Sequence, residues 1–491
     1  MKKSLLLMSA AVMALTSVAQ TEHIHVFRND DNHSTVKAAD NQQISFGTNL
    51  RNQQVMIITD SLGKTTEIAM DAIDSCVVRE TALPEFHFFL TDYPNWTELT
   101  GNKDDKHPAT MYMVGNGMYK DIDEMELSEF RGRGNSTWNM AKKPYRFKMA
   151  KKNSICGLPK AKTFALIANY IDCTLMRNAI ALWVAQHLEM PFTNHCVPVK
   201  VFFNGIDKGQ YMLTEKIGVG SGSVDIDETT GMLFELDSNY DEDFKFQYTW
   251  YENYGTKTLP VMVKDPDLAE LAADTTVTNI TDAQAYFKLW QNDFTTMANA
   301  VTSRAATESL SDVIDVESAV NFFFVNGLAN NHEMKHPKSF YIHKKSLEEG
   351  EVYHFGPVWD FDWAFTFDGH EGASATAYMV ASKGDQNGYE FIKHIFANTE
   401  FRELFKKKLD EFTAAGGGYD QLKAYIEEYA NLIEPTAREN GVLWPDTKPH
   451  AASWCVQKDS YEFRQNLETL KQWIETRVNF MKSDSNFGLY R

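Results

Sequence analysis

Short apolar stretches alternate with polar clusters in the first part of the chain, and this pattern predicts β-structure. Between residues 21 and 83, the apolar runs are separated by groups of Asn, Asp and Gly, as in β-hairpins. We therefore expect a small N-terminal β module at 21–83. Farther along, the turn at Asn204 and Gly205 indicates another hairpin. The same pattern predicts strands at 86–90, 110–114, 144–149, 199–203 and 210–215.

The spacing of apolar residues changes to a helical period farther along the chain. Between residues 175 and 188, apolar side chains recur on one face of a 3.6-residue period, and Asp172 lies just upstream at a capping position. After Lys264 helical spacing dominates, apart from a strand pair expected at 339–344 and 353–358. Helices are predicted at 283–300, 317–328, 401–412, 419–433 and 461–482. A β-rich region followed by a helix-rich region predicts an α+β fold with a cleft between two lobes.

The first twenty residues have a different pattern from the rest of the chain. Lys2 and Lys3 precede a short apolar stretch, which ends in small residues around Ala19. This is the layout of a cleavable signal peptide, so we expect 1–20 to be removed and the protein to be periplasmic, on the cell surface or secreted. The alternative is an apolar N-terminal helix of the fold. The stretch is shorter than the roughly 20 residues of a membrane-spanning helix, and we expect no membrane span.

Composition narrows the classes of partner. The 491 residues carry a formal net charge of -19, and such an acidic surface repels nucleic acid and anionic membranes. A ligand that carries phosphate would therefore require a local basic pocket or a divalent metal ion. The five cysteines contain no Cys-x-x-Cys pair, which argues against a zinc knuckle and against a dense disulfide framework. At least one thiol must stay unpaired within a monomer.

The most distinctive carboxylate pair is Asp360 and Asp362, which lie two residues apart among aromatic side chains. In extended backbone this spacing places both carboxylates on one face. Magnesium prefers clustered oxygen ligands of this kind and retains water and phosphate oxygens as its other ligands. Two structural aspartates near a turn are the alternative, although uncompensated charge beside a core is costly. We regard the pair as a candidate metal site.

A glycine-containing loop at 131–138 brings two guanidinium groups next to flexible backbone. Arg131 and Arg133 alternate with glycines, so the loop could present bidentate donors and backbone amides to an anion. The alternative is a tight loop whose arginines pair with acidic residues. Lys148 follows in a predicted strand, on the same face as Arg146, from where an ammonium group can reach phosphate oxygens.

Two other charged segments have structural explanations that compete with functional ones. Asp172, Arg177 and Asn178 surround a helix start, where capping and a local ion pair account for them. Glu215 ends a predicted strand, and the sequence does not decide whether it is a cleft carboxylate or an exposed partner of Lys216. We keep both interpretations of Glu215.

A polar segment follows the predicted helix 317–328 and contains Asn331 and Glu333. Such a segment ahead of a strand pair and two aspartates matches phosphoryl transfer, in which one group orients the nucleophile and carboxylates bind metal. His332 and His336 have the spacing of zinc ligands on a helix. We do not favour zinc, because the proline after His336 opposes a continuing helix.

Taken together, these segments resemble the CotH family, whose members are spore-coat-protein-H-like secreted or surface proteins with an atypical protein-kinase fold. The resemblance covers about residues 84–485 and depends on several motifs in a fixed order. They are RGRGNSTWNMAKKPYRFKM at 131–149, LIANYIDCTLMRNAIA at 166–181, VFFNGIDKGQYMLTEKI at 201–217, HPKSFYIHK and FGPVWDFDWAF within 336–365, and LKQWIETRVNFM at 470–481.

The resemblance implies a bilobal fold with a β-rich N-lobe and a helix-rich C-lobe, and ATP-dependent phosphorylation of a protein acceptor. It implies that Lys148 lies near the phosphates, that Glu215 lies in the nucleotide cleft, and that Asp360 and Asp362 bind Mg²⁺ or Mn²⁺. The arginine loop at 131–138 is expected to contribute to nucleotide binding. The acceptor would be an extracellular or surface protein.

The chain departs from the family pattern at the catalytic segment. Many relatives have Asn-x-Asp where this chain has Asn331 and Glu333, and Glu is one methylene longer than Asp. Either Glu333 orients the acceptor hydroxyl or this member is catalytically weak, since a base must lie within about 3 Å of its proton. A catalytically inactive binding or surface-structural protein on the same scaffold is the alternative function. The glycine-rich stretch 218–224 is interpreted as a flap.

Overall fold

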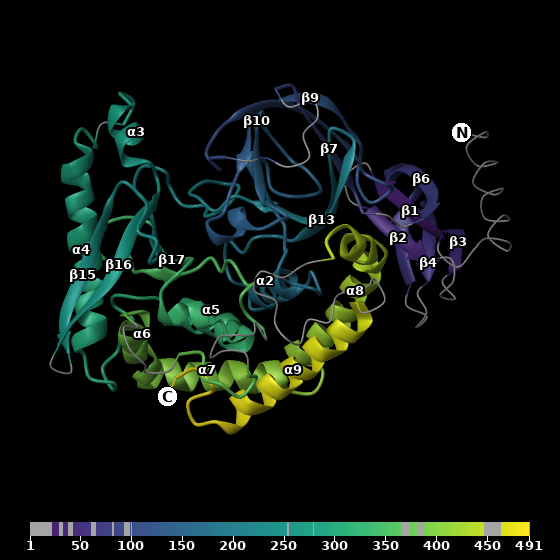
Figure 1. Cartoon of the computed structure of the whole chain (residues 1–491). Helices are drawn as coiled ribbons and strands as arrows, with labels where there is room; N and C mark the ends of the chain where they lie inside the picture. The colour runs from purple at the N-terminus through teal and green to yellow at the C-terminus, as the bar shows by residue number, and fades with distance from the viewer. Residues whose placement is uncertain are drawn as a thin grey trace.

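The computed structural model is a mixed α+β fold (Figure 1). The structure describes residues 22–28, 33–37, 43–59, 65–80, 83–92, 99, 101–252, 255–277, 279–365, 374–380, 387–445 and 463–490. The predicted signal peptide, 1–20, lies outside these residues. The described part contains two small sheets, a closed barrel, a five-stranded sheet and eight α-helices. The α+β prediction is confirmed at this level.

The N-terminal region contains the hairpins that its sequence pattern predicts. Six strands form two antiparallel three-stranded sheets, ordered β2-β1-β6 and β3-β4-β5. A small cluster of Val26, Met56 and Ile68 is buried there. That 21–83 forms a separate module stays a prediction. The strands are β1 (Glu22–Arg28), β2 (His33–Lys37), β3 (Gln43–Thr48), β4 (Gln54–Thr59), β5 (Thr65–Ala69) and β6 (Ile73–Glu80).

The seven strands after this region close into a barrel in the order β10-β11-β13-β12-β7-β8-β9. Alternate residues point inward, and phenylalanines such as Phe88, Phe130 and Phe147 fill the interior. In the antiparallel register, Arg146 lies opposite Arg131 on one side and Ala165 on the other. The strands are β7 (Glu85–Leu90), β8 (His107–Val114), β9 (Ile122–Gly132), β10 (Tyr145–Asn153), β11 (Ala161–Ile167), β12 (Val197–Phe203) and β13 (Ile206–Glu215).

A second large sheet, ordered β15-β16-β14-β17-β18, stands beside the barrel (Figure 1). Its strands are β14 (Met232–Leu236), β15 (Lys245–Glu252), β16 (Gly255–Asp265), β17 (Phe340–Lys344) and β18 (His354–Phe355). The pair β17–β18 confirms the predicted strand pair, whereas β14, β15 and β16 were not predicted. Helix α4 (Ala283–Ser303) follows the short α3 (Leu268–Ala273), and Phe294 on α4 packs against Phe234 and Phe246 of the sheet.

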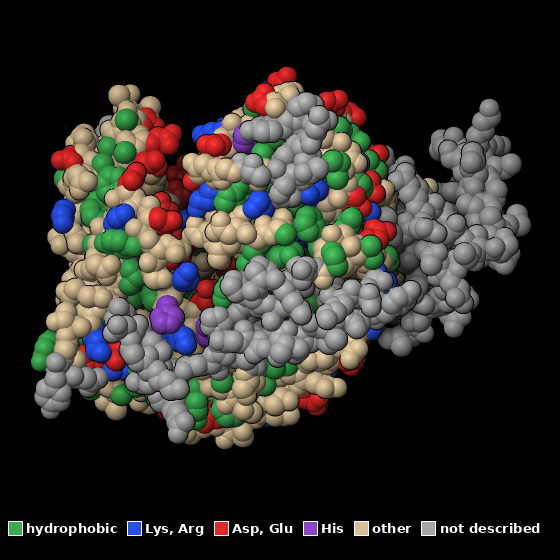
Figure 2. Space-filling model, viewed as in Figure 1, with side chains coloured by type: hydrophobic (Ala, Val, Ile, Leu, Met, Phe, Trp, Pro, Cys, Tyr) green, Lys and Arg blue, Asp and Glu red, His purple; other side chains and the backbone are tan. Residues whose placement is uncertain are grey.

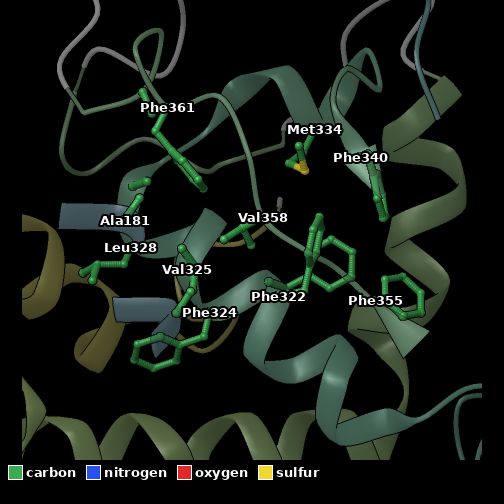
Figure 3. Close-up of a cluster of buried hydrophobic side chains, with 14 of the residues drawn as sticks. Ala181, Phe322, Phe324, Val325, Leu328, Met334, Phe340, Phe355, Val358 and Phe361 are labelled. Carbon is green, nitrogen blue, oxygen red and sulfur yellow. The ribbon is translucent and has the colours of Figure 1, made fainter. Parts of the chain in front are cut away.

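The helix-rich part surrounds α5 (Val316–Ala329), in which apolar residues occupy most positions and every residue except Glu317 is buried. Phe322, Phe324 and Val325 of α5 belong to the largest core cluster (Figure 3). The segment after β18 joins this core through Val358 and Phe361. The other helices are α2 (Arg177–His187), α6 (Asn387–Ala397), α7 (Thr399–Thr413), α8 (Gly418–Leu443) and α9 (Phe463–Ser483).

A buried lysine joins the barrel to the helices. Lys142 is 1% exposed, and its ammonium group donates to Ala168 O at 3.0 Å and to Asn440 Oδ1 of α8 at 2.8 Å. It also donates to Gln210 O of β13 and lies over the Tyr211 ring. This contact fixes the end of the barrel against α8.

Two further predictions concern the membrane and the cysteines. None of the helices in the described part of the chain is both long and apolar enough to cross a bilayer. Cys76, Cys156 and Cys196 are free thiols, which confirms that at least one thiol stays unpaired.

Candidate functional site

A cleft of about 510 Å³ opens between the barrel and the five-stranded sheet. Figure 2 shows a hollow between the side formed by β15 and β16 and the barrel, with acidic and basic side chains around it. Its charged and aromatic lining includes Arg131, Arg133, Lys142, Arg146, Lys216, Glu235, Asp237, Lys264, Glu333, Lys338, Tyr341, Trp359, Asp360, Asp362 and Trp363. Most of the arginines come from the barrel, and most of the carboxylates come from the sheet and the segments next to it.

The barrel wall of the cleft carries two arginines that share one carboxylate. Glu129 is 5% exposed and accepts from Arg146 Nη2 at 2.6 Å and from Arg131 Nε at 3.1 Å. Burial alone would raise the pKa of Glu129, but the hydrogen bond and charge of Arg146 lower it below its usual value. Asp104 also binds Arg131. Two guanidinium groups are thereby held at the cleft on neighbouring strands.

Arg133 connects the barrel wall to the acidic wall. Its guanidinium lies 5.4 Å from the centre of the Trp359 ring. Burial lowers the pKa of Arg133, while the charges of Asp360 and Asp362 oppose this shift. Arg131 and Arg133 both line the cleft, but Arg131 is paired with Glu129 and Asp104 as the alternative interpretation expected, so anion binding by this loop stays a prediction.

Asp360 and Asp362 lie together in the cleft, on the segment that follows β18. Asp362 is 2% exposed, and burial followed by the charge and hydrogen bond of Asp360 raises its pKa well above the usual value. Its Oδ1 atom has no hydrogen-bond donor among the described residues. A buried carboxylate oxygen without a donor is costly, and a divalent cation would compensate it. The pair therefore fits the oxygen ligands of Mg²⁺ or Mn²⁺.

The described residues offer such a cation no closed set of protein ligands. Among the residues that the structure describes, no group of three or more His, Cys, Asp or Glu side chains is arranged to hold a metal ion. Magnesium commonly retains waters and binds substrate phosphates besides one or two carboxylates. Zinc is not supported, because His332 lies in a short 3₁₀ helix, η4 (His332–Lys335), which ends before His336.

Of the two predicted catalytic residues, Glu333 lines the cleft and Asn331 is buried outside it. Glu333 lines the cleft, and burial together with the charge of Asp360 raises its pKa to about 8. Asn331 is 1% exposed and is not part of the cleft lining. Its Oδ1 accepts from the Glu333 N–H at 3.2 Å, and its Nδ2 donates to Asn326 Oδ1 at 3.0 Å. Asn331 therefore fixes the backbone of Glu333 through a hydrogen bond from outside the cleft lining.

Two of the predicted site residues lie outside this cleft. Lys148 lies on the same face of β10 as Arg146, as predicted. Its side chain is exposed to solvent and does not line the cleft. Glu215 is 2% exposed and binds His195 through the N–H at 2.9 Å and through Nδ1 at 2.5 Å. The hydrogen bond of Glu215 raises the pKa of His195. The roles that the resemblance assigns to Lys148 and Glu215 stay predictions.

Several cleft residues were not singled out from the sequence. Lys216 lines the cleft in contact with solvent, although the surrounding protein desolvates it enough to lower its pKa, and Asp265 opposes that shift. Burial raises the pKa of Asp237 to about 6. Asp237 accepts from the N–H groups of Asn239 at 2.7 Å and Ser339 at 3.3 Å. The adjacency of Lys216 to Glu215 was the only sequence signal for these residues.

The start of α2 also reaches the aspartates. Asp172 is not the helix cap that the sequence predicted, because the N-cap residue of α2 is Met176, but its side chain accepts from the Arg177 N–H at 2.9 Å. Arg177 additionally donates from Nη1 to the backbone oxygen of Asp362 at 2.8 Å. Asn178 accepts from the Phe361 N–H at 2.9 Å. The sequence analysis accounted for all three residues by capping and a local ion pair. The structure shows that Arg177 and Asn178 also bind the backbone of the segment that carries the two aspartates.

Comparison with known proteins supports the resemblance on which these expectations depend. The family model described as CotH kinase protein matches residues 130–481, which is most of the chain. No curated protein matches the chain. The matched range contains the arginine loop, the start of α2, η4 and the segment with both aspartates. The chain therefore belongs to the CotH kinase family.

Proposed function

We propose that this protein is an exported phosphotransferase of the CotH type, which binds ATP with Mg²⁺ or Mn²⁺ and phosphorylates a protein acceptor. In this proposal the barrel and the helix-rich part act as the two lobes of a kinase-like fold. The observation that carries it is the cleft, in which Asp360 and Asp362 face the arginines of the barrel wall. Phosphoryl transfer requires this combination of carboxylates for a divalent cation and cations for phosphate oxygens.

The basic residues of the cleft would bind and orient the phosphates. Arg146 and Arg131 are fixed by Glu129, so their guanidinium groups lose little freedom when an anion binds. Lys216 adds an ammonium group in the same cleft. Asp360 and Asp362 would hold the cation, which when bound neutralises charge on the phosphate oxygens.

Glu333 would orient the acceptor hydroxyl and accept its proton. Its raised pKa gives the carboxylate a stronger proton affinity than an exposed Glu has, and a general base is most effective when its pKa lies near the working pH. Lys338 lines the same part of the cleft and opposes the rise in the pKa of Glu333. The backbone of Glu333 is held by Asn331, so the longer side chain starts from a fixed position.

The test is nucleotide binding by the mature protein. Melting temperatures are measured with ATP alone, with Mn²⁺ alone and with both, for the unaltered protein and for Asp360→Asn/Asp362→Asn. A rise that requires both ligands and both aspartates supports the proposal and leads to a phosphotransfer assay with radiolabelled ATP. No rise in the unaltered protein favours a binding or surface-structural protein on the same scaffold.

A further inference from the structure

We infer that Asn178 and Arg177 of α2 are positioning residues that hold Asp360 and Asp362 in the orientation that binds the cation. This inference rests on the proposed function, because it assigns a cation to the two aspartates. It goes beyond that function because it assigns the orientation of the two aspartates to residues of α2. From the sequence, the first residues of this helix were explained by capping and a local ion pair alone.

Asn178 binds the peptide group between the two aspartates. It is 4% exposed, and its Oδ1 accepts from the Phe361 N–H at 2.9 Å. Its Nδ2 donates to Asn169 Oδ1 at 3.0 Å, and Asn169 follows β11 and lines the cleft. One side chain thus joins the end of a barrel strand to the backbone that separates the carboxylates.

Arg177 binds the peptide group that follows Asp362. Its side chain is completely buried, and Nη1 donates to Asp362 O at 2.8 Å. Asp172 faces the guanidinium, with 3.6 Å between Nε and Oδ1, and also accepts from the Arg177 N–H at 2.9 Å. Asp172 is itself held by the N–H and hydroxyl of Thr174. The guanidinium is therefore in contact with both Asp172 and the backbone oxygen of Asp362.

The segment that carries the aspartates requires such support because it lies outside regular secondary structure. Asp360 has a φ of 67°, in the left-handed region that is unfavourable for a residue with a side chain. Such a conformation persists only where its surroundings determine it. Phe361 is 0% exposed and anchors the segment in the core near Ala181 (Figure 3). The hydrogen bonds from α2 then fix the orientation of the peptide groups.

The two carboxylates also repel each other, which makes their orientation sensitive to the loss of these bonds. Both side chains line the same cleft two residues apart, and Asp362 Oδ1 has no hydrogen-bond donor among the described residues. If the Phe361 N–H or the Asp362 oxygen lost its partner, the aspartates could separate. Residues that orient metal ligands in this way typically change metal affinity by about 10- to 100-fold when they are replaced.

The experiment measures Mn²⁺ binding by calorimetry, with and without ATP, in the full mature chain. Asn178→Ala is expected to raise the dissociation constant for Mn²⁺ about tenfold or more. Asn178→Asp retains an acceptor for the Phe361 N–H, and the Asn169 amide can rotate to donate to it. This conservative variant is expected to recover most of the affinity. If Asn178 only stabilised the fold, the Mn²⁺ affinity would not fall in Asn178→Ala and recover in Asn178→Asp.

Asn398→Ala is the matched control. Asn398 is 2% exposed and also makes two side-chain hydrogen bonds, from the Phe401 N–H at 3.2 Å and to Glu308 O at 2.8 Å. It caps α7 and does not line the cleft. This variant is expected to lower the melting temperature and leave Mn²⁺ affinity unchanged.

The outcomes separate this inference from the proposed function. Absence of Mn²⁺ binding by the unaltered protein contradicts the proposed function, and the inference with it. Binding by the unaltered protein with the same affinity in Asn178→Ala overturns the inference alone. Should Asn178→Ala not fold, Arg177→Lys is the second test, because lysine lacks the planar guanidinium held between Asp172 and Asp362. Unchanged Mn²⁺ affinity in that variant also overturns the inference.

Discussion

Glu333 lies beside Asp360 in the cleft, and burial together with the charge of that aspartate raises the pKa of Glu333 to about 8. Asp362 is close enough for its own pKa to be raised by burial and by both carboxylates. Glu333 and Asp362 are thus held where their charged forms are unfavourable without a counter-ion. Such an arrangement costs stability and is typical of functional sites.

This relationship predicts how the stability of the cation-free protein depends on pH. The folded-state pKa of Glu333, about 8, lies above the unfolded value of 4.5. Between these values the folded protein holds a proton that the unfolded chain has lost, so this group lowers the free energy of unfolding as pH rises from about 4.5 to 8. We expect Glu333→Gln to flatten that decline. Melting temperatures measured in EDTA from pH 5 to 8 check this.

The matched control for this prediction is Glu349→Gln, because Glu349 is an exposed carboxylate in the loop after β17. It is expected to follow the unaltered protein across the whole pH range. If Glu333→Gln followed it equally closely, the carboxyl group of Glu333 would not be desolvated in the folded protein.

A second prediction compares two lysines of the barrel. Lys216 lines the cleft, whereas Lys148 is exposed outside it. A hydrogen bond to a charged group contributes about 1.5–3 kcal/mol, so Lys216→Ala should weaken ATP binding about tenfold or more. Lys148→Ala should leave the affinity unchanged. Fluorescence titration with a labelled ATP analogue measures both, and the reverse order would favour the role that the resemblance assigns to Lys148.

A third prediction concerns the contact between the barrel and the helices. Lys142→Met removes a buried ammonium group and with it the donor to Ala168 O and Gln210 O, whereas Asn440 Oδ1 keeps the Gln210 N–H at 3.2 Å. We expect a loss of about 3 kcal/mol in the free energy of unfolding, because each buried acceptor without a partner costs about 1–3 kcal/mol. Urea denaturation of Lys142→Met and of the exposed-lysine control Lys148→Met checks this. Equal midpoints would contradict the assignment.

Local patterns in the sequence predicted the elements whose structure depends on local interactions. The strand expected at 86–90 is β7, and the helix expected at 175–188 contains α2. The alternation that placed Lys148 on the same face of its strand as Arg146 was correct, because side chains alternate along any strand. The alternation could not show that Arg146 lines the cleft and that Lys148 does not.

Features that depend on distant contacts were not predicted. Barrel closure requires the parallel pairing of β12 with β7, in which Lys200 lies opposite Glu85. Strand β14 was missed because all of its residues are buried, so it lacks the alternation of a half-exposed strand. The sequence left Glu215 as either a cleft carboxylate or an exposed partner of Lys216, and could not show that it is buried against His195, which comes from a segment before β12.

The most direct test of the central claim is the melting temperature of the mature protein with ATP and Mn²⁺, compared with that of Asp360→Asn/Asp362→Asn. A nucleotide site at the two aspartates should give a rise in the unaltered protein that requires both ligands and is absent from the variant. An equal rise in the two proteins would place the nucleotide away from the aspartates. No rise in the unaltered protein would contradict the nucleotide site itself.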